Sequence, residues 1–198
     1  MPMREPIRVY LAEMDGLWFA ACISRGALIG CAFSRDRDEA LSPLRRLGGG
    51  TPLPSLEYRE NRTARVAIEA MLRRVRGLNP EETPPLDLSR LSGFSRRVLE
   101  RASKIPRGYV STYRDVASSI GCVKGWRAVG TALRNNPFPL LIPCHRVVRS
   151  DLTVGGYMGS YNEGTALKRR LLEKEGVKFR GERVSPESFW RLGFEAGR

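Results

Sequence analysis

The segment around Cys144 holds residue types that can do nucleophilic chemistry. Cys144 follows an apolar run, residues 140–142, and a proline, and it is followed by His145, the only histidine of the chain, and by Arg146. A cysteine after an apolar run is commonly a buried, inert thiol. Here the neighbouring cations favour the thiolate, because positive charge lowers a free-cysteine pKa of about 8.5. The pattern therefore predicts a reactive cysteine where the chain leaves a buried strand.

A cysteine beside a histidine is also found in hydrolases, where the histidine takes the thiol proton. In an extended segment the side chains of adjacent residues point in opposite directions, so direct transfer from Cys144 to His145 is hindered. The chain has no second histidine. We therefore disfavour hydrolysis, although a relay through water stays open.

Neither a metal nor a cofactor is expected. The four cysteines, at positions 22, 31, 122 and 144, form no C-x-x-C motif, whereas zinc sites draw on closely spaced Cys or His ligands. The glycine-rich run at 48–54 lacks the lysine and the flanking helix of a phosphate-binding loop. The sequence thus predicts chemistry carried out by side chains alone.

The basic residues are concentrated in one part of the chain. The 198 residues have a formal net charge of +13, and residues 90–149 carry twelve Lys and Arg against Glu100 and Asp115, a balance of +10. This concentration favours a polyanion-binding face, and we expect nucleic acid in preference to a membrane or an acidic protein. No apolar run has the length of a membrane helix and no secretory signal is evident, so we expect an intracellular, cytoplasmic protein. The arginine-rich composition is compatible with a thermophilic source.

Residues 1–85 predict a small α/β domain that includes a linker. Residues 6–34 alternate apolar and polar positions around Ser24-Arg25-Gly26, which predicts a β-hairpin with arms of about eight residues. Cys22 and Cys31 would be cross-strand neighbours on its arms, reduced inside a cell, although thermophiles do form intracellular disulfides. Helical spacing covers residues 36–47 and 61–76. The proline-rich run at 77–85 indicates the linker.

Residues 86–198 predict a mainly α domain. Ser92 can cap a helix over residues 93–104, and Thr112 with Asp115 resembles a capping box for a helix up to residue 120. A glycine-started turn at 121–125 joins it to a helix at 126–135, which is the helix-turn-helix pattern. In that last helix we expect an apolar face to be buried and the opposite face to carry arginines. The apolar face holds Trp126, Val129 and Leu133. The outer face holds Arg127, Gly130, Thr131 and Arg134.

Further elements lead to and from the cysteine. Two prolines, at 137 and 139, stop the preceding helix. We expect residues 140–142 to be buried and extended, residues 155–159 to form a glycine-rich loop, and residues 165–175 to form a helix. Ser185 and Pro186 predict the start of a short final helix.

Several sequence blocks resemble one family of DNA-repair proteins. The heptad IPCHRVV at residues 142–148 is similar to the active-site motif of the O6-alkylguanine-DNA alkyltransferases, or methylated-DNA–protein-cysteine methyltransferases. Blocks at 94–99, 108–113, 127–130 and 134–137 are similar to that family's opening helix, its approach to the helix-turn-helix, its recognition helix and the turn after it. The resemblance covers residues 86–178. Residues 1–85 resemble the family's N-terminal domain only in length and in rough element order.

The resemblance implies a set of catalytic residues around Cys144, which would accept the alkyl group. His145 would be linked to the thiol through water and to the carboxylate of Glu175. Tyr113 would protonate the guanine ring as it leaves, and Asn136 would bracket the active-site segment with hydrogen bonds. From the residues alone, Tyr113 is equally a core tyrosine and Glu175 an acid near a helix C-terminus, where the dipole is unfavourable.

The resemblance also implies a DNA-binding surface. Arg127 would enter the duplex and fill the gap left by a flipped-out guanine, with a plain phosphate contact as the alternative. The helix would lie in the minor groove, only about 6 Å wide, which suits its small residues, Ala132 among them. Val147 would accept the exocyclic amine of guanine through its carbonyl. The expected binding residues are Thr112, Arg127, Ala128, Gly130, Thr131, Arg134, Val147, Tyr157, Met158 and Gly159.

Two positions depart from the pattern of the family. Met158 stands where many relatives have serine, but the implied role there, a backbone N–H donor to the guanine oxygen, is kept by methionine. Residues 160–164 lengthen the loop relative to some members, so the width of the pocket is not predicted.

The sequence therefore predicts repair of double-stranded DNA by stoichiometric transfer of an alkyl group from O6 of guanine to Cys144. The protein would be a monomer that acts once and needs no cofactor. The alternative is a DNA-binding damage sensor or regulator without transfer activity; such sensors lack the reactive cysteine, which is present here.

Overall fold

A computed structural model describes residues 6–48, 55–158 and 162–192. The chain divides into two compact units, Met1–Arg74 with Asn79–Arg90 and Pro137–Leu141, and Val75–Leu78 with Leu91–Asn136 and Ile142–Arg198. The predicted boundary between residues 85 and 86 stays a prediction, because compactness alone does not show that either part folds by itself.

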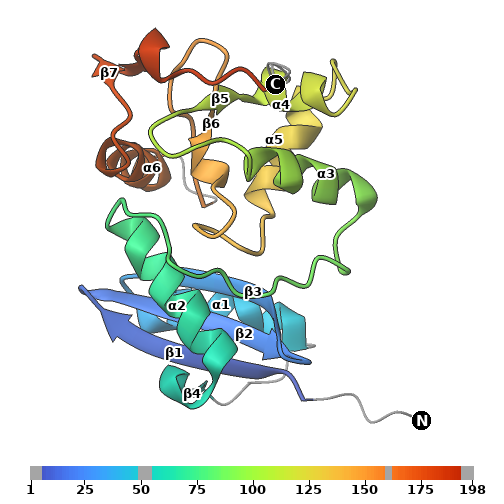
Figure 1. Cartoon of the computed structure of the whole chain (residues 1–198), viewed down its shortest axis with the longest axis vertical. Coiled ribbons are helices and arrows are strands. Elements are labelled where there is room, and N and C mark those ends of the chain that lie inside the picture. The colour runs from blue at the N-terminus through green and yellow to red at the C-terminus, as the bar shows by residue number, and fades with distance from the viewer. Residues whose placement is uncertain (1–5, 49–54, 159–161, 193–198) are drawn as a thin grey trace. The chain divides into compact units, whose positions relative to one another are not determined.

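The first unit is built on a four-stranded sheet of order β3-β2-β1-β4 (Figure 1). Strands β1 (Arg8–Met14), β2 (Leu17–Ser24) and β3 (Ala27–Ser34) form an antiparallel meander, and β4 (Ser55–Glu57) pairs in parallel with β1. The predicted hairpin around Ser24-Arg25-Gly26 is confirmed, since β2 and β3 are its two arms of eight residues each, but the prediction missed β1 as a third strand within residues 6–34. Asp15 and Gly16, at φ 55° and 69°, form an additional turn, and Asp-Gly is a strong hairpin signal that the prediction overlooked.

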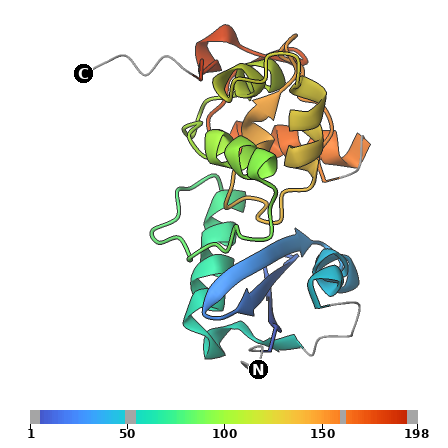
Figure 2. The same ribbon diagram turned by 90° about the vertical axis from the view of Figure 1, so that its right-hand side faces the viewer.

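Two helices cover the sheet. The helix α1 (Arg37–Arg45) begins at Asp36, whose side chain accepts a hydrogen bond from the Glu39 N–H, and α2 (Arg62–Val75) follows short 3-10 turns at Arg46–Gly48 and Tyr58–Glu60. Figures 1 and 2 show α1 and α2 on opposite faces of the sheet. The core on the α1 face consists of Val9, Leu11, Ala20, Cys22, Ile29, Ala32, Ala40 and Leu44.

The two cysteines of the sheet are not directly paired. Cys22 lies opposite Gly30, and Cys31 lies opposite Ala21, so the side chains of the two cysteines point to opposite faces. The prediction that they are cross-strand neighbours was therefore wrong; neither cysteine forms a disulfide, and both are buried. Burial raises the pKa of Cys22 to about 12, so this thiol stays uncharged.

The segment Pro137–Leu141 packs with the first unit. The Cys31 N–H donates to the carbonyl of Pro137 at 2.8 Å, and the Cys31 Sγ lies 3.7 Å from the carbonyl oxygen of Pro139. Leu140 is buried but has φ 68°. The prediction of an extended segment at 140–142 was wrong because this left-handed residue turns the chain within the run.

The second unit is mainly helical. Its helices are α3 (Gly93–Ala102), α4 (Tyr113–Ser119), α5 (Trp126–Arg134) and α6 (Asn162–Lys174), and its short strands are β5 (Ser111–Thr112), β6 (Val147–Val148), β7 (Phe179–Arg180) and β8 (Arg183–Val184). β5 pairs with β6 in parallel, and β7 with β8 in antiparallel fashion. The predicted final helix is a single 3-10 turn, Pro186–Ser188.

The helix-turn-helix consists of α4 and α5, which pack against each other and against α3. Both predicted caps are confirmed, since Ser92 accepts from the Ser95 N–H and Thr112 from the Asp115 N–H. Trp126 was predicted to be buried and is 40% exposed. By helical spacing it shares the face of Val129 and Leu133, but it is the first residue of α5, where the core covers that face less completely.

The predicted fold class, an α/β N-terminal part and a mainly α C-terminal part with a helix-turn-helix, is confirmed. Within the described residues, no helix combines the length and the apolar character that crossing a bilayer requires.

Candidate active site and DNA-binding face

Cys144 is held in a tight backbone turn. Its N–H donates to the carbonyl of Ile142 at 2.8 Å across Pro143, whose φ of −80° and ψ of 62° are those of an inverse γ-turn. A one-turn 3-10 helix, Cys144–Arg146, then leads into β6. Successive side chains of a 3-10 helix are about 120° apart, so the premise that Cys144 and His145 lie on an extended segment was wrong.

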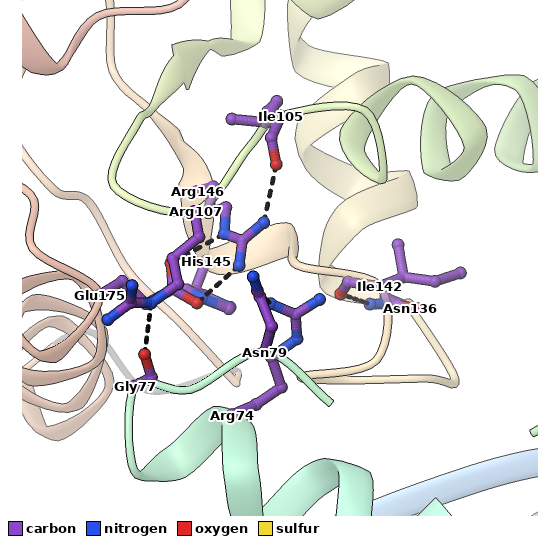
Figure 3. Close-up of polar contacts among 10 residues, drawn as sticks. All are labelled: Arg74, Gly77, Asn79, Ile105, Arg107, Asn136, Ile142, His145, Arg146 and Glu175. Carbon is purple, nitrogen blue, oxygen red and sulfur yellow. Dashed lines mark hydrogen bonds and ion pairs between the residues drawn. The ribbon is translucent and has the colours of Figure 1, made fainter. Parts of the chain in front are cut away.

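Glu175, directly after α6, is a buried carboxylate shared by two neighbouring residues. The Nε and Nη2 atoms of Arg146 donate to its two oxygens at 2.8 and 2.7 Å, and the Nε2 atom of His145 lies 3.1 Å from Oε1. The third nitrogen of the guanidinium, Nη1, donates to the carbonyl of Ile105 at 2.7 Å (Figure 3). The structure thus brings His145 and Glu175 together and adds Arg146, for which the sequence predicted no partner.

The protonation of this cluster follows from its contacts. Burial tends to raise the pKa of Glu175, but hydrogen bonds and charges from His145 and Arg146 lower it to about 2. Burial lowers the pKa of His145, although Glu175 acts in the opposite direction. We expected Glu175 to make the histidine more basic; its effect has that sign, and burial outweighs it. At neutral pH the pair is therefore an ionised carboxylate and a neutral imidazole.

The tautomer of His145 follows from the same pair. An ionised carboxylate can only accept hydrogen bonds, so the proton of the neutral imidazole lies on Nε2, which donates to Glu175. Nδ1 is then left with a lone pair. It is buried and makes no hydrogen bond to the described residues, so the acceptor side of the ring is available to a proton carrier.

The Cys144 thiol is 7% exposed and has several polar neighbours. The side-chain Nδ2 of Asn136 donates to Cys144 Sγ at 3.2 Å and to the carbonyl of Ile142 at 3.0 Å. Burial raises the pKa of Cys144, against the lowering effects of Asn136, Lys168 and Tyr157. The expectation that surrounding cations lower this pKa was wrong in direction, because burial outweighs them. The resting group is a thiol.

Lys168, on α6, is a buried residue of the site that the sequence reasoning missed. It is 1% exposed, and its Nζ donates to the carbonyl of Val147 at 2.6 Å and lies 5.7 Å from the ring centroid of Tyr113. Burial lowers the pKa of Lys168 to about 8, although the thiolate form of Cys144 would act in the opposite direction. Its place seven residues before Glu175, two helical turns on the same face, was the signal available in the sequence.

Tyr113 begins α4 and lies beside α5. A Cβ atom added to Gly130 would lie 3.9 Å from the Tyr113 ring, so the ring packs close to the backbone of α5. Burial raises the pKa of Tyr113, with a further contribution from Cys144, so the phenol keeps its proton at neutral pH. Thr112 is 5% exposed and its hydroxyl caps α4, which leaves it little surface for a DNA contact.

The outer face of α5 carries most of the predicted DNA-binding residues of the helix. Its exposed members are Arg127, Ala128, Thr131 and Arg134, while Gly130 is half-buried. The hydroxyl of Thr131 donates to the carbonyl of Arg127 at 3.3 Å. Ala132, expected on the groove-facing side, is only 6% exposed and belongs to the core.

The loop before α6 lies beside the histidine. Tyr157 is 7% exposed and its ring centroid lies 6.2 Å from that of His145 in an edge-on arrangement. Met158 is 43% exposed with φ 50°, and Gly159 lies outside the described residues. A Cβ atom on Gly164 would lie 1.9 Å from the carbonyl oxygen of Tyr157, so the start of α6 requires glycine there, which the sequence reasoning did not detect.

Across the described part of the chain, no group of three or more His, Cys, Asp or Glu residues has the arrangement of a metal site. The groups gathered around Cys144 are the amide of Asn136, the imidazole of His145 with Glu175 and Arg146, the ammonium of Lys168, and the rings of Tyr113 and Tyr157.

Comparisons with known proteins agree with this arrangement. Residues 93–177 match the family described as "6-O-methylguanine DNA methyltransferase, DNA binding domain". A protein of Thermococcus gammatolerans named methylated-DNA–protein-cysteine methyltransferase is 32% identical over 82% of this chain and 90% of that protein. This chain belongs to that family. The resemblance noted in the sequence is thereby confirmed.

Other methylated-DNA–protein-cysteine methyltransferases match mainly the second unit. The protein of Methanothermobacter thermautotrophicus is 50% identical over 49% of this chain. The chain spans 52% of the length of that relative and 58% of the relative from Archaeoglobus fulgidus.

A solved structure shares the fold over most of the chain. The O6-methylguanine methyltransferase of Mycobacterium tuberculosis has a TM-score of 0.66 at 25% identity and covers 86% of this chain and 93% of its own. The likeness therefore reaches beyond residues 86–178, where the sequence blocks end.

Proposed function

We propose that this protein repairs alkylated DNA by transferring an alkyl group from O6 of guanine to the sulfur of Cys144. The observation that carries the proposal is the contact of Asn136 with the Cys144 Sγ, 3.2 Å away, in a site that also holds a neutral imidazole bound to Glu175. A buried thiol oriented in this way suits one displacement on a ligand inserted from outside. The names of the relatives support the same reaction.

The first step is removal of the thiol proton. Because burial raises the pKa of Cys144, the thiol needs a base when the substrate is bound. The free lone pair of His145 Nδ1 supplies it through a bridging water, and Glu175 stabilises the imidazolium that forms. The ammonium of Lys168 and the amide of Asn136 stabilise the thiolate.

The second step is a single displacement at the alkyl carbon. A bond forms between Cys144 Sγ and that carbon while the carbon–O6 bond breaks, and its electron pair passes to the guanine ring. Tyr113, whose raised pKa keeps it protonated, donates its proton to the ring. The phenolate and the imidazolium then exchange protons with solvent, which restores both groups. The thioether remains on Cys144, so each molecule acts once and requires no cofactor.

We propose that the exposed face of α5 binds double-stranded DNA from the minor groove. Arg127 is exposed at the start of the helix and would fill the space left by the extruded guanine. Binding to phosphates by the basic segment 90–149 would be salt-sensitive and nearly independent of sequence. Two further expectations stay predictions: that the protein is a monomer and that it works inside the cell.

Mass spectrometry on the full chain tests the proposal. After incubation with a short duplex containing O6-methylguanine, we expect the peptide containing Cys144 to gain one methyl group and no more. Cys144→Ala should gain none. Cys22→Ala is the matched control, because the pKa of Cys22, about 12, keeps that buried thiol unreactive; it should gain methyl as the unchanged protein does. Repair of several lesions by one molecule would refute the proposal.

The alternative is a damage sensor that binds the lesion without transfer. The contacts around Cys144 favour transfer, because a sensor has no use for an oriented thiol. Tight binding to the modified duplex with no gain in mass would establish the sensor instead.

A further inference from the structure

Trp126 is a large aromatic side chain left exposed at the start of the recognition helix. It is 40% exposed and is the first residue of α5, directly before Arg127. The Cζ of Arg127 lies 4.8 Å from the centroid of the indole ring. The two side chains therefore form a stacked pair, in which the ring holds the guanidinium at the helix start.

The turn before the helix adds to this exposed surface. Val123 is 68% exposed, and Lys124 beside it is also exposed. Six large hydrophobic residues are exposed in the described part of the chain, and two of them, Val123 and Trp126, fall within four residues of each other. We call residues 123–127 the α5 tip. Its apolar side chains are flanked by the cations of Lys124 and Arg127, so the tip is both apolar and positively charged.

Such a surface matches one kind of partner. Proteins that bind the minor groove often insert apolar side chains between base steps, beside arginines and lysines that contact the backbone. An indole presents a flat ring to a base whatever its identity, and aromatic stacking on bases tolerates any sequence. A protein partner for this tip would need acidic groups opposite Lys124 and Arg127, whereas DNA supplies negative charge and ring faces together.

We infer that Trp126 is a DNA-contacting residue that stacks on a base next to the one replaced by Arg127. The inference rests on the proposed function for the position of the duplex, and it adds a second inserted side chain to the recognition helix. Stacked on Trp126 in the free protein, Arg127 would enter the duplex with less loss of side-chain freedom. The indole then covers the base exposed when the guanine leaves the stack.

Tryptophan emission reports this contact directly. The chain has three tryptophans, Trp18, Trp126 and Trp190. Trp190 is the matched control, because it is likewise 40% exposed and packs against another aromatic ring, that of Tyr109. On titration with an unmodified duplex, we expect Trp190→Phe to keep the quenching of emission seen in the unchanged protein, and Trp126→Phe to lose it.

Binding affinity gives a second measurement. We expect Trp126→Ala to bind the duplex about tenfold more weakly, which is within the range of one lost base–aromatic stack. Trp126→Tyr should recover most of the affinity because it keeps an aromatic ring, and Trp190→Ala should bind normally. Quenching that persists in Trp126→Phe would overturn the inference, as would equal affinity in Trp126→Ala. The inference would also be overturned if Trp126→Ala bound more weakly but DNA did not quench the emission of Trp126 in the unchanged protein. Trp126 would then act only by holding Arg127.

The alkyl-transfer assay separates this inference from the proposed function. Trp126→Ala should react with the free base O6-methylguanine at the rate of the unchanged protein and more slowly with a modified duplex. An unchanged protein that transfers from neither substrate would refute the proposed function, while the quenching experiment on unmodified DNA would still decide the role of Trp126.

Discussion

Arg146 and Glu175 form a two-point ion pair in which both side chains are buried, with exposures of 3% and 1%. Their atoms lie 2.7 and 2.8 Å apart in the two contacts. The pair fixes the carboxylate that His145 uses, and the Ile105 carbonyl occupies the remaining side of the guanidinium. The imidazole of His145 is thus oriented by a contact whose loss would leave a buried charge unpaired.

Glu175→Gln should destabilise the fold. The substitution removes the anion and leaves Arg146 buried without its counter-charge, which we expect to lower the free energy of unfolding by about 3–5 kcal/mol. Urea denaturation measures the change. Glu173→Gln, two residues earlier on α6, is the control, because its pair with Arg169 is partly exposed and should contribute only about 0.3–0.5 kcal/mol. Equal stability of the two variants would contradict the ion-pair account.

Acid should weaken the fold through the same carboxylate. The pKa of Glu175 is lowered from 4.5 to about 2, so its stabilising contribution is complete above 4.5 and is lost as the pH falls from 4.5 towards 2. The loss in free energy of unfolding between these two pH values should be about 3 kcal/mol. Unfolding measured at several acidic pH values should show a steeper loss for the unchanged protein than for Glu175→Gln. Parallel curves would show that other carboxylates cause the acid sensitivity.

Lys168→Met should slow the reaction of the thiol. Without the ammonium the pKa of Cys144 rises further, and a rise of one pKa unit leaves about tenfold less thiolate at neutral pH. The pH profile of Cys144 alkylation by iodoacetamide measures this, and we expect its midpoint to move upward. Lys178→Met is the control, because that side chain is 71% exposed and pairs with Glu187. If Lys168→Met left the pH profile unchanged, Lys168 would have no influence on the pKa of Cys144.

Gly164→Ala should disturb the loop that carries Tyr157. A Cβ atom there would lie 1.9 Å from the Tyr157 carbonyl oxygen, so we expect a loss of about 1–3 kcal/mol of stability together with slower alkyl transfer. Thermal unfolding and the transfer assay measure the two effects. Gly93→Ala, where the Cβ meets nothing within 4 Å, should leave both unchanged. If Gly164→Ala were as stable as the unchanged protein and transferred alkyl groups as fast, residue 164 could not lie this close to the carbonyl of Tyr157.

The helices of the second unit were predictable because their signals are local. Ser92 and Thr112 cap α3 and α4 through hydrogen bonds to residues three positions away, and such bonds are encoded in a few neighbouring residues. The turn at Leu140 was not predictable in this way. Its left-handed conformation is supported by packing rather than by its own residue type.

The site could be predicted only where a short motif or the family pattern carried it. The motif and the family pattern predicted Cys144, His145 and Glu175, and the structure brings the last two within 3.1 Å. The direction of the pKa shift of the Cys144 thiol was not predicted correctly, because the burial of this residue depends on elements distant in the chain. Trp126 was misplaced since periodicity assigns a face to a helix but does not say how far the core extends at its first residue.

The burial of Arg146 also changes what a count of basic residues means. Arg146 is buried and bound by Glu175, and Arg96 pairs with Glu100 at the surface, so neither offers a full charge to phosphate. Binding releases condensed counterions from DNA only for cations that reach the backbone. The slope of log affinity against log salt concentration should therefore be shallower than the twelve basic residues of segment 90–149 imply.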